Sequence, residues 1–166
     1  WTVAKYLLEF ERGGVAYSPR VKAALLKLKE MSQKEAGGDG RRLIDDPDFK
    51  TRLAKLEIGV QASEIIEKRV MSALSQGQNP GASSSIFKLR GSELLQETLE
   101  MTMNALGYYA NPYQPEAFVP GNNVEPIAPE YGLVATSKYY NQRAATIYAG
   151  SSEVQRSILA KHVLGL

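Results

Sequence analysis

The sequence predicts an all-α protein: an antiparallel up-down four-helix bundle with extra short helices, in a single domain. Apolar residues recur at three- and four-residue spacing over several long stretches. The connections between these stretches are rich in glycine and proline, and no stretch alternates with the period of a strand. Long helices with short connections pack as an antiparallel bundle. A chain of 166 residues is long enough to bury its own core.

Two helical stretches precede the first polar connection. Residues 5–10 are apolar, and two glycines at positions 13 and 14 interrupt them. Ser18 followed by Pro19 predicts the start of a new helix, with Ser18 as its N-cap. We expect this helix to end near Gly37. Its apolar positions share one face: Val21, Ala24, Leu25, Leu28 and Met31.

Two longer helices fill the middle of the chain. Asp46 before Pro47 predicts the start of a helix of about 28 residues, because aspartate caps a helix and proline fits its first turn. A break with glycine and proline over 76–82 separates it from a helix over 83–106, which Gly107 ends. The apolar faces are formed by Phe49, Leu53, Leu56, Val60, Ile66, Val70 and Leu74 and by Leu95, Leu99, Met103 and Leu106.

The last third of the chain begins with a long irregular loop. Residues 108–129 contain five prolines, and this density excludes a helix. Loops of this length in compact domains are commonly functional or cover another element. Helices are expected again over 131–143 and 152–164. The bundle needs no chemistry for its stability, so a function must be sought in particular motifs.

Composition excludes several classes of function. Hydrophobic residues make up 43% and charged residues 23%, as in ordinary globular proteins, and the net charge of +2 gives no nucleic-acid footprint. The chain has no cysteine and one histidine, His162, without a paired E-x-x-H motif, so we expect no metal site. No apolar run approaches the roughly 18 residues of a membrane span. We expect a cytoplasmic protein that makes no contact with membranes.

Three segments resemble the C-terminal domain of the acyl-CoA dehydrogenase family. The most specific is I-Y-A-G-S-S-E-V-Q-R over 147–156, which is similar to the family pattern I-Y-E-G-T-S-x-I-Q-R before a terminal helix. Residues 8–12, L-E-F-E-R, resemble the family's L-x-x-E-R segment. Residues 88–107 are similar to the long helix that ends in the Q-x-F-G-G turn. The resemblance implies that 1–166 is one such domain, and that N-terminal helical and middle β domains belong to the same longer protein.

The resemblance implies a known chemistry. Acyl-CoA dehydrogenases use FAD to convert an acyl-CoA thioester into an enoyl-CoA, and a carboxylate removes the proton α to the carbonyl. The glutamate that serves as base in many members is replaced here by Ala149, which cannot accept a proton. Isovaleryl- and long-chain-specific members carry the base just before the arginine of L-x-x-E-R. That position is Glu11, which we predict to be the base; the alternative is a solvated carboxylate beside Arg12.

The same resemblance places Leu8 and Arg12 at the substrate. Arg12 would hold the CoA arm, and its alternative is an ion pair with Glu9 or Glu11. Asn104 and Gly107 match the turn that holds the ADP part of FAD across a subunit interface.

Four residues of the most specific motif are implied at the flavin: Tyr148, Gly150, Ser151 and Glu153. Alternatives stay open for most of them. Tyr148 can be a core aromatic residue, and Gly150 can serve an unusual turn. Ser151 or Ser152 can cap the last helix, with Glu153 in its first turn.

With Ala149 in place of the family's glutamate, the sequence resembles a bacterial branch that acts on unusual CoA esters, such as dicarboxylic or steroid side-chain acids. Some members of that branch are complexes of two different subunits. The resemblance therefore implies a homo-oligomer or a hetero-oligomer with a related subunit, and electron-transfer flavoprotein as electron acceptor. We expect the isolated fragment to be inactive. Two alternatives remain: a non-catalytic subunit of a heteromeric enzyme, and a helical interaction module without enzymatic role.

Overall fold

The computed structural model describes residues 1–4, 17–78 and 81–166. The all-α prediction is confirmed, because the described residues contain no strand, only an isolated bridge between Ala36 and Arg42. The α-helices are α2 (Ser18–Ser32), α3 (Pro47–Ser75), α4 (Ser84–Leu106), α5 (Ala135–Gln142) and α6 (Ser152–Leu159). The short helices are η1 (Leu43–Asp45), η2 (Gly81–Ser83), η3 (Gly107–Ala110), η4 (Pro115–Phe118), η5 (Glu130–Gly132), η6 (Arg143–Thr146) and the π turn η7 (Ala160–Leu164).

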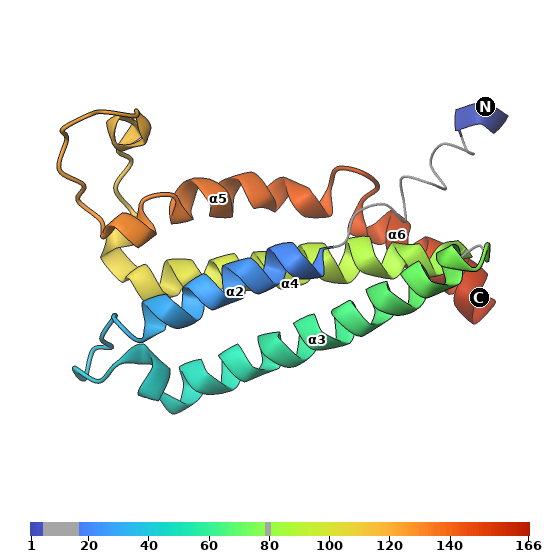
Figure 1. Ribbon diagram of the computed structural model, residues 1–166, viewed down its shortest axis with the longest axis horizontal. Helices are drawn as coiled ribbons and strands as arrows, with labels where there is room; N and C mark the ends of the chain where they lie inside the picture. Colours follow the sequence, from blue (N-terminus) through green and yellow to red (C-terminus); the bar gives the residue numbers. More distant parts are fainter. Residues whose placement is uncertain (5–16, 79–80) are drawn as a thin grey trace.

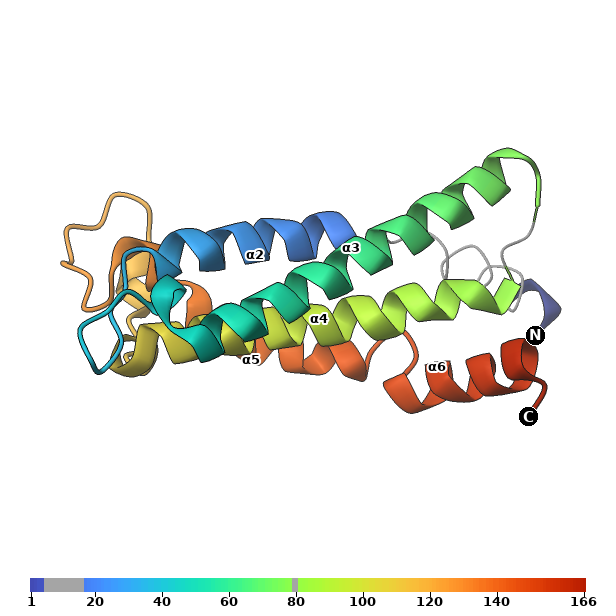
Figure 2. The same ribbon diagram turned by 90° about the horizontal axis from the view of Figure 1, so that it is seen from below.

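Four helices lie side by side along the long axis of the molecule. Successive helices run in opposite directions in the order α2, α3, α4, α5 (Figure 1). The connections 33–46 and 107–134 gather at one end of the bundle. At the other end, α6 lies against the first half of α4, as the view in Figure 2 shows. Helix α4 is central, since it packs against α2, α3, α5 and α6.

The core forms where the apolar faces of α2, α3 and α4 meet. The predicted positions Val21, Leu28 and Val60 are almost fully buried. The face of α3 is buried over only part of its length, since Leu74 near its end is 42% exposed. The core cluster contains Tyr17, Val21, Leu25, Leu28, Met31, Leu53, Leu56, Val60, Leu94, Leu95, Leu99, Met101, Ala105, Leu106, Ala110 and Ala135. No described helix is both long and apolar enough to cross a membrane.

The predicted start of α3 is confirmed and that of α2 is wrong in detail. The Asp46 carboxylate accepts a hydrogen bond from Phe49 N at 2.7 Å, as a capping aspartate does. Ser18 does not cap α2, because its hydroxyl donates to the buried Glu67 carboxylate of α3. The cap position is Tyr17, without a side-chain cap. A tertiary contact thus replaces the local one.

Two predicted boundaries also shift. Helix α2 ends at Ser32 rather than near Gly37, because the chain turns back on itself there: Gly37 N donates to Arg41 O at 2.8 Å. Helix α5 begins at Ala135 rather than at residue 131, after the separate turn η5. Gly132 in that turn lies so close to Leu106 that an added Cβ would stand 2.8 Å from Leu106 Cδ2. Gly107 has φ of +54° and ends α4 as predicted.

Candidate functional site

The turn between η6 and α6 holds two consecutive residues in the left-handed region. Ala149 has φ of +53° and Gly150 has φ of +85°. A Cβ at Gly150 would lie 2.5 Å from Gln155 Nε2, whose amide folds back and donates to Ala149 O at 3.4 Å. The backbone conformation at 150 therefore favours glycine, and a side chain there would also displace the end of Gln155. The turn points Ile147 outward, with 71% of its surface exposed.

Ser151 and Glu153 start helix α6. Ser151 is its N-cap, and its hydroxyl oxygen accepts from Val154 N at 3.4 Å. A hydrogen bond from the Ser151 hydroxyl lowers the pKa of the exposed Glu153 carboxyl. The ionised carboxylate complements the positive end of the helix and disfavours a second anion there. The uncharged part of a flavin therefore suits this turn better than its phosphates do.

Tyr148 connects the turn with the beginning of α2. It is 46% exposed, so the alternative of a core aromatic residue is wrong. Tyr17 lies close enough to be affected by it: burial raises the pKa of the Tyr17 phenol, and the nearby Tyr148 adds to that rise. Tyr17 packs against Gly91 of α4. The turn, the start of α2 and the middle of α4 thus meet in one region.

The junction of α4 and α6 contains buried polar atoms that lack a hydrogen-bond partner in the described part of the chain. They are Ser85 Oγ, Lys88 Nζ, Ser152 Oγ and Gln155 Oε1. Burial lowers the pKa of the Lys88 ammonium, and the nearby Glu153 opposes this. Buried polar groups are almost always paired in folded proteins. Ser152 and Gln155 lie beside the 147–151 turn, and unpaired atoms of this kind are expected where a group from outside the described residues completes a junction.

These polar atoms were not predicted from the sequence. The signal that could have found part of the set is the spacing of Ser85, Lys88 and Ser92 at i, i+3 and i+7, which places polar side chains on one face of a helix buried on several sides. Glu67 was missed as well. Its role depends on a contact across about 50 positions of sequence, which no local pattern reveals.

A flavin fits the residues of this region. The turn is exposed, a hydroxyl and an amide oxygen without partners lie at the start of α6, and Tyr148 presents an aromatic side chain beside them. Hydroxyl and amide groups suit the polar edge of an isoalloxazine ring, and an aromatic side chain suits its face. Tyr148, Gly150, Ser151 and Glu153 all lie at this turn, and their contact with a flavin stays a prediction.

Asn104 and Gly107 lie elsewhere. Asn104 is exposed near the end of α4, about 20 Å along the helix from Gly91 at a rise of about 1.5 Å per residue. Gly107 is exposed, with no atom within 4 Å of an added Cβ. One chain therefore does not bring these two residues to the turn at 147–151. This separation agrees with a role toward a second subunit, which the resemblance implies.

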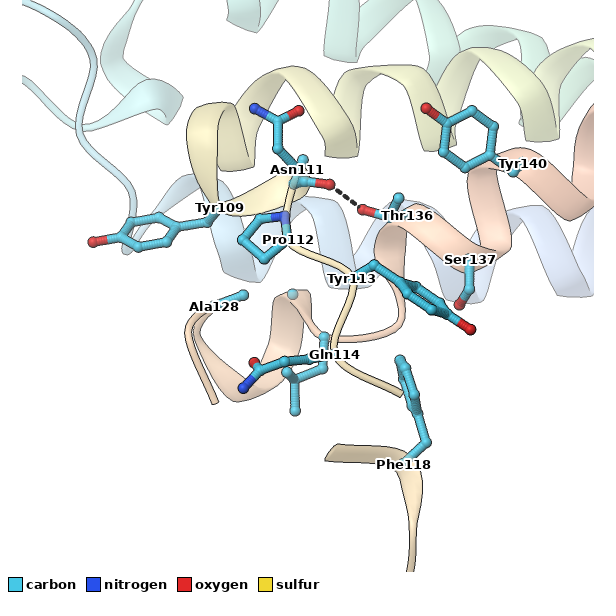
Figure 3. A pocket seen from close by; sticks show the side chains of 13 residues that line it. Tyr109, Asn111, Pro112, Tyr113, Gln114, Phe118, Ala128, Thr136, Ser137 and Tyr140 are labelled. Atoms are coloured by element: carbon cyan, nitrogen blue, oxygen red, sulfur yellow. Dashed lines mark hydrogen bonds between the residues drawn. The ribbon is translucent and has the colours of Figure 1, made fainter. Parts of the chain in front are cut away.

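A cavity of about 470 Å³ lies beyond Gly107, between the proline-rich loop and α5 (Figure 3). Tyr113 and Phe118 from the loop and Tyr140 from α5 line it, and none of its described lining residues is charged. The loop is held at its base by Thr136, whose hydroxyl donates to Ala110 O at 2.5 Å, the dashed line in Figure 3. The Gln114 amide also joins the two arms of the loop through Glu125 O and Ile127 N.

The predicted base and substrate residues Leu8, Glu11 and Arg12 lie outside the described residues. Nothing structural is therefore assigned to them here. Among the described residues, no group of three or more histidine, aspartate or glutamate side chains is placed to hold a metal ion. The polar atoms at the α4–α6 junction are likewise hydroxyl, amide and ammonium groups rather than a set of metal ligands.

Comparison with known proteins identifies the family. Residues 1–164 match the family described as acyl-CoA dehydrogenase, C-terminal domain. The chain is 29% identical over its full length to acyl-CoA dehydrogenase IpdE1 of Mycobacterium tuberculosis and covers 38% of that protein. The ChsE4-ChsE5 complex from Mycobacterium tuberculosis is similar in structure, with a TM-score of 0.76 and 26% identity over 100% of this chain and 40% of that chain.

Butyryl-CoA dehydrogenase from Megasphaera elsdenii shares the fold, with a TM-score of 0.74 and 18% identity over 98% of this chain and 38% of that chain. The chain thus spans about two-fifths of the length of the relatives it matches. Since the family match extends over almost every residue, from 1 to 164, the chain belongs to the acyl-CoA dehydrogenase family and corresponds to its C-terminal helical domain.

Proposed function

We propose that this chain is part of a FAD-dependent acyl-CoA dehydrogenase, an oxidoreductase that converts an acyl-CoA thioester into the α,β-unsaturated enoyl-CoA. The observation that carries the proposal is the 147–151 turn, which joins the family motif to unpartnered polar atoms of α4 and α6. FAD, when bound, supplies the acceptor for the hydride that leaves the β carbon. The protein must hold the thioester in place, exclude water and remove the α proton.

In this proposal the two groups of cofactor residues serve different flavins. Tyr148, Gly150, Ser151 and Glu153 contact the flavin ring in the same subunit. Asn104 and Gly107, at the opposite end of α4, contact the ADP part of the FAD held by a neighbouring subunit. The separation along α4 supports this division, because one extended cofactor at the turn does not need both groups. The protein would then be a homo-oligomer, or a hetero-oligomer with a related subunit.

We propose Glu11 as the base. Ala149, at the family's usual base position, has only a methyl group, so the turn itself supplies no carboxylate there. The interaction of Tyr148 with Tyr17 supports the choice, because it brings the turn close to the residue that directly follows the 5–16 segment. The Glu11 carboxylate would take the α proton, and Leu8 and Arg12 of the same segment would contact the acyl chain and the CoA arm.

The test uses the full-length protein that contains this chain, purified with any partner subunit. Its bound flavin is recorded by absorbance, and bleaching is followed after a panel of acyl-CoA esters is added. We expect bleaching in the unsubstituted protein and in Ala149→Gly, and a loss of about 10³-fold or more in its rate in Glu11→Gln, with the flavin still bound. Full-rate bleaching in Glu11→Gln would reject Glu11 as the base.

A non-catalytic subunit of a heteromeric enzyme is the second candidate. Ala149 favours it, because a subunit that lacks the carboxylate of the turn can act as the structural half of a pair. One structural relative is named as a complex of two chains, ChsE4 and ChsE5. In this case Glu11→Gln has no effect on bleaching, and substitution of the partner's base abolishes it. A protein that binds no flavin with any partner would instead be a helical interaction module.

Three further expectations follow from the family alone. Electron-transfer flavoprotein is the proposed acceptor of the electrons from the reduced flavin. The cytoplasm is the proposed location. The isolated chain is expected to be inactive, since relatives are more than twice as long and the remaining domains would complete the pocket. Reduction of purified electron-transfer flavoprotein by the full-length enzyme and its substrate tests the first of these.

A further inference from the structure

A basic groove runs along the bundle between α2, α4 and α5. Its volume is about 270 Å³. Arg20 and Lys27 line it from α2 and Lys138 lines it from α5, while none of the lining residues that the structure describes carries a carboxylate. Arg20 and Lys27 are two helical turns apart, so they project from the same face of α2. The remaining lining is apolar or amide in character: Ala23, Ala24, Leu95, Leu99, Asn141 and Gln142.

Two lysines on the opposite edge of α2 form ion pairs, unlike the three cations of the groove. Lys22 and Lys29 form ion pairs with Glu64 and Glu57 of α3. In the described part of the chain, none of the three groove cations forms an ion pair. On that side α5 presents another lysine in place of a carboxylate. Like charges around one groove repel each other, and a bound anion would remove that repulsion.

A second observation comes from a neutral side chain. Gln142 lines the groove and is only 4% exposed. Its Oε1 atom has no hydrogen-bond partner within the described residues, although its backbone oxygen accepts from Gln96 Nε2 at 2.7 Å. A buried amide oxygen without a partner is rare, because leaving it unpaired costs the protein stability. This oxygen has almost no accessible surface, so the side chain must rotate before a ligand in the groove with an N–H or O–H group can provide the missing donor.

We propose that this groove binds a small phosphorylated molecule. Its phosphate would be held by Arg20, Lys27 and Lys138, its donor group would bond to Gln142 Oε1, and its apolar part would pack on Leu95 and Leu99. A phosphate monoester carries nearly two negative charges and several acceptor oxygens, which suits a groove lined by three cations better than a single carboxylate does. The site does not depend on the proposed dehydrogenase activity, since it uses none of the residues assigned to it.

The first experiment locates binding by lysine acetylation and mass spectrometry on the full-length protein. Acetylation is measured with and without sodium pyrophosphate, and again with glycerol 3-phosphate. We expect both probes to slow acetylation of Lys27 and Lys138 at least threefold. Lys68 and Lys161, on α3 and η7 outside the groove, serve as controls in the same spectra and should change little. Equal protection of all four lysines, or of none, would overturn the proposal.

The second experiment measures affinity by calorimetry. Lys27→Gln combined with Lys138→Gln should raise the Kd for pyrophosphate about tenfold or more. Lys68→Gln combined with Lys161→Gln changes the net charge equally and should raise it less than twofold. Flavin content and bleaching should stay normal in both proteins, which separates this site from the proposed active site. Equal weakening in the two double variants would show that only the net charge attracts the anion, and would reject the groove.

Two further results decide the chemistry of the ligand. Gln142→Met removes the acceptor with little change in size, so it should weaken glycerol 3-phosphate about fivefold and leave pyrophosphate unchanged. An equal effect on both probes, or on neither, would exclude Gln142 as a ligand contact. Protection of Lys27 and Lys138 by an unphosphorylated glutamate-rich peptide, but not by pyrophosphate, would replace the phosphate ligand with an acidic protein segment.

Discussion

Two buried ionisable side chains of the bundle stand in contrast. The Glu67 carboxylate of α3 accepts hydrogen bonds from Tyr17 N at 2.8 Å, from Ser18 N at 3.0 Å and from the Ser18 hydroxyl. The Lys88 ammonium of α4 is almost as deeply buried, and within the described residues it has no hydrogen-bond partner. Glu67 lies at the start of α2, and Lys88 lies at the junction with α6.

The difference in hydrogen bonding distinguishes Glu67, which stabilises the fold, from Lys88, which is expected to face a group outside the described residues. Glu67 accepts hydrogen bonds from the free N–H groups of the first turn of α2. These bonds offset the free-energy cost of burying its charge. Lys88 lies among the unpartnered polar atoms of Ser85, Ser152 and Gln155. Such a set is unfavourable in a finished core and is expected where a cofactor or another part of the protein packs. Stability measurements can therefore test which junction is complete.

The largest expected effect is at Gly91, where α2 begins on the surface of α4. An added Cβ would overlap the Cβ and Cγ atoms of Tyr17, next to the backbone, where the side chain cannot move away. Gly91→Ala should lower the free energy of unfolding by about 3 kcal/mol, as expected for overpacking. Urea unfolding followed by circular dichroism measures this change.

Gly59→Ala is the matched control, since Gly59 is also inside a helix. Its added Cβ would lie 2.8 Å from Leu94 Cδ2, the movable end of a side chain. The gain in helix propensity of about 1 kcal/mol should offset this contact, so the free energy of unfolding should change little. Equal losses in the two variants would mean that the start of α2 is packed no more closely against α4 than α3 is at Gly59.

The second effect is at Glu67. Glu67→Gln keeps the size of the side chain and removes its charge, so the hydrogen bonds to Tyr17 N and Ser18 weaken. We expect a loss of about 2 kcal/mol in the free energy of unfolding. Glu64→Gln, one turn earlier on α3, removes partly exposed ion pairs with Lys22 and Lys68 and should have a clearly smaller effect. A loss at Glu64 as large as that at Glu67 would contradict the idea that the hydrogen bonds to the start of α2 make Glu67 the more stabilising carboxylate.

The contrast between Glu67 and Lys88 also shows which features could be predicted from the sequence alone. The long helices, the Asp46 cap and the end of α4 at Gly107 depend on neighbouring residues, and all were predicted correctly. The start of α2 was wrong because Glu67 competes for Ser18 from a distant helix. The site was predictable only as a motif: the resemblance placed Tyr148, Ser151 and Glu153 together, but Lys88 and Gln155 became visible only when α4 and α6 were packed against each other.

The third prediction, at Lys88, is a gain in the free energy of unfolding rather than a loss. Lys88→Met removes a buried ammonium that has no hydrogen-bond partner among the described residues, and leaves an apolar side chain of similar length. Because burial lowers the pKa of Lys88, its charged form is disfavoured in the folded state. The free energy of unfolding should therefore rise by about 1 kcal/mol in protein freed of flavin. Lys55 is an exposed residue of α3, and Lys55→Met is the control, which should not raise the free energy of unfolding. A loss of stability in Lys88→Met would show that Lys88 already has a partner, and the contrast with Glu67 would fail.

The smallest effect is at Ser151, which caps α6 through a long hydrogen bond of 3.4 Å to Val154 N. Ser151→Ala should lower the free energy of unfolding by about 0.5 kcal/mol, at the lower end for such caps. Ser157→Ala, an exposed position within α6, should change it less. Urea unfolding at neutral pH measures both variants.

Acid pH gives Ser151 a second and more specific readout. The Ser151 hydrogen bond lowers the pKa of Glu153 below its ordinary value of 4.5, so the ionised form is favoured in the folded state. The resulting stability is present above pH 4.5 and is lost as the pH falls through the lowered value. In Ser151→Ala the pKa of Glu153 should rise toward 4.5, and this part of the acid dependence should disappear. Carboxyl chemical shifts of Glu153, followed by NMR from pH 6 to pH 2, report that pKa directly. An unchanged pKa would mean that Ser151 caps the helix without contacting Glu153, so its hydroxyl would already be free to meet a flavin.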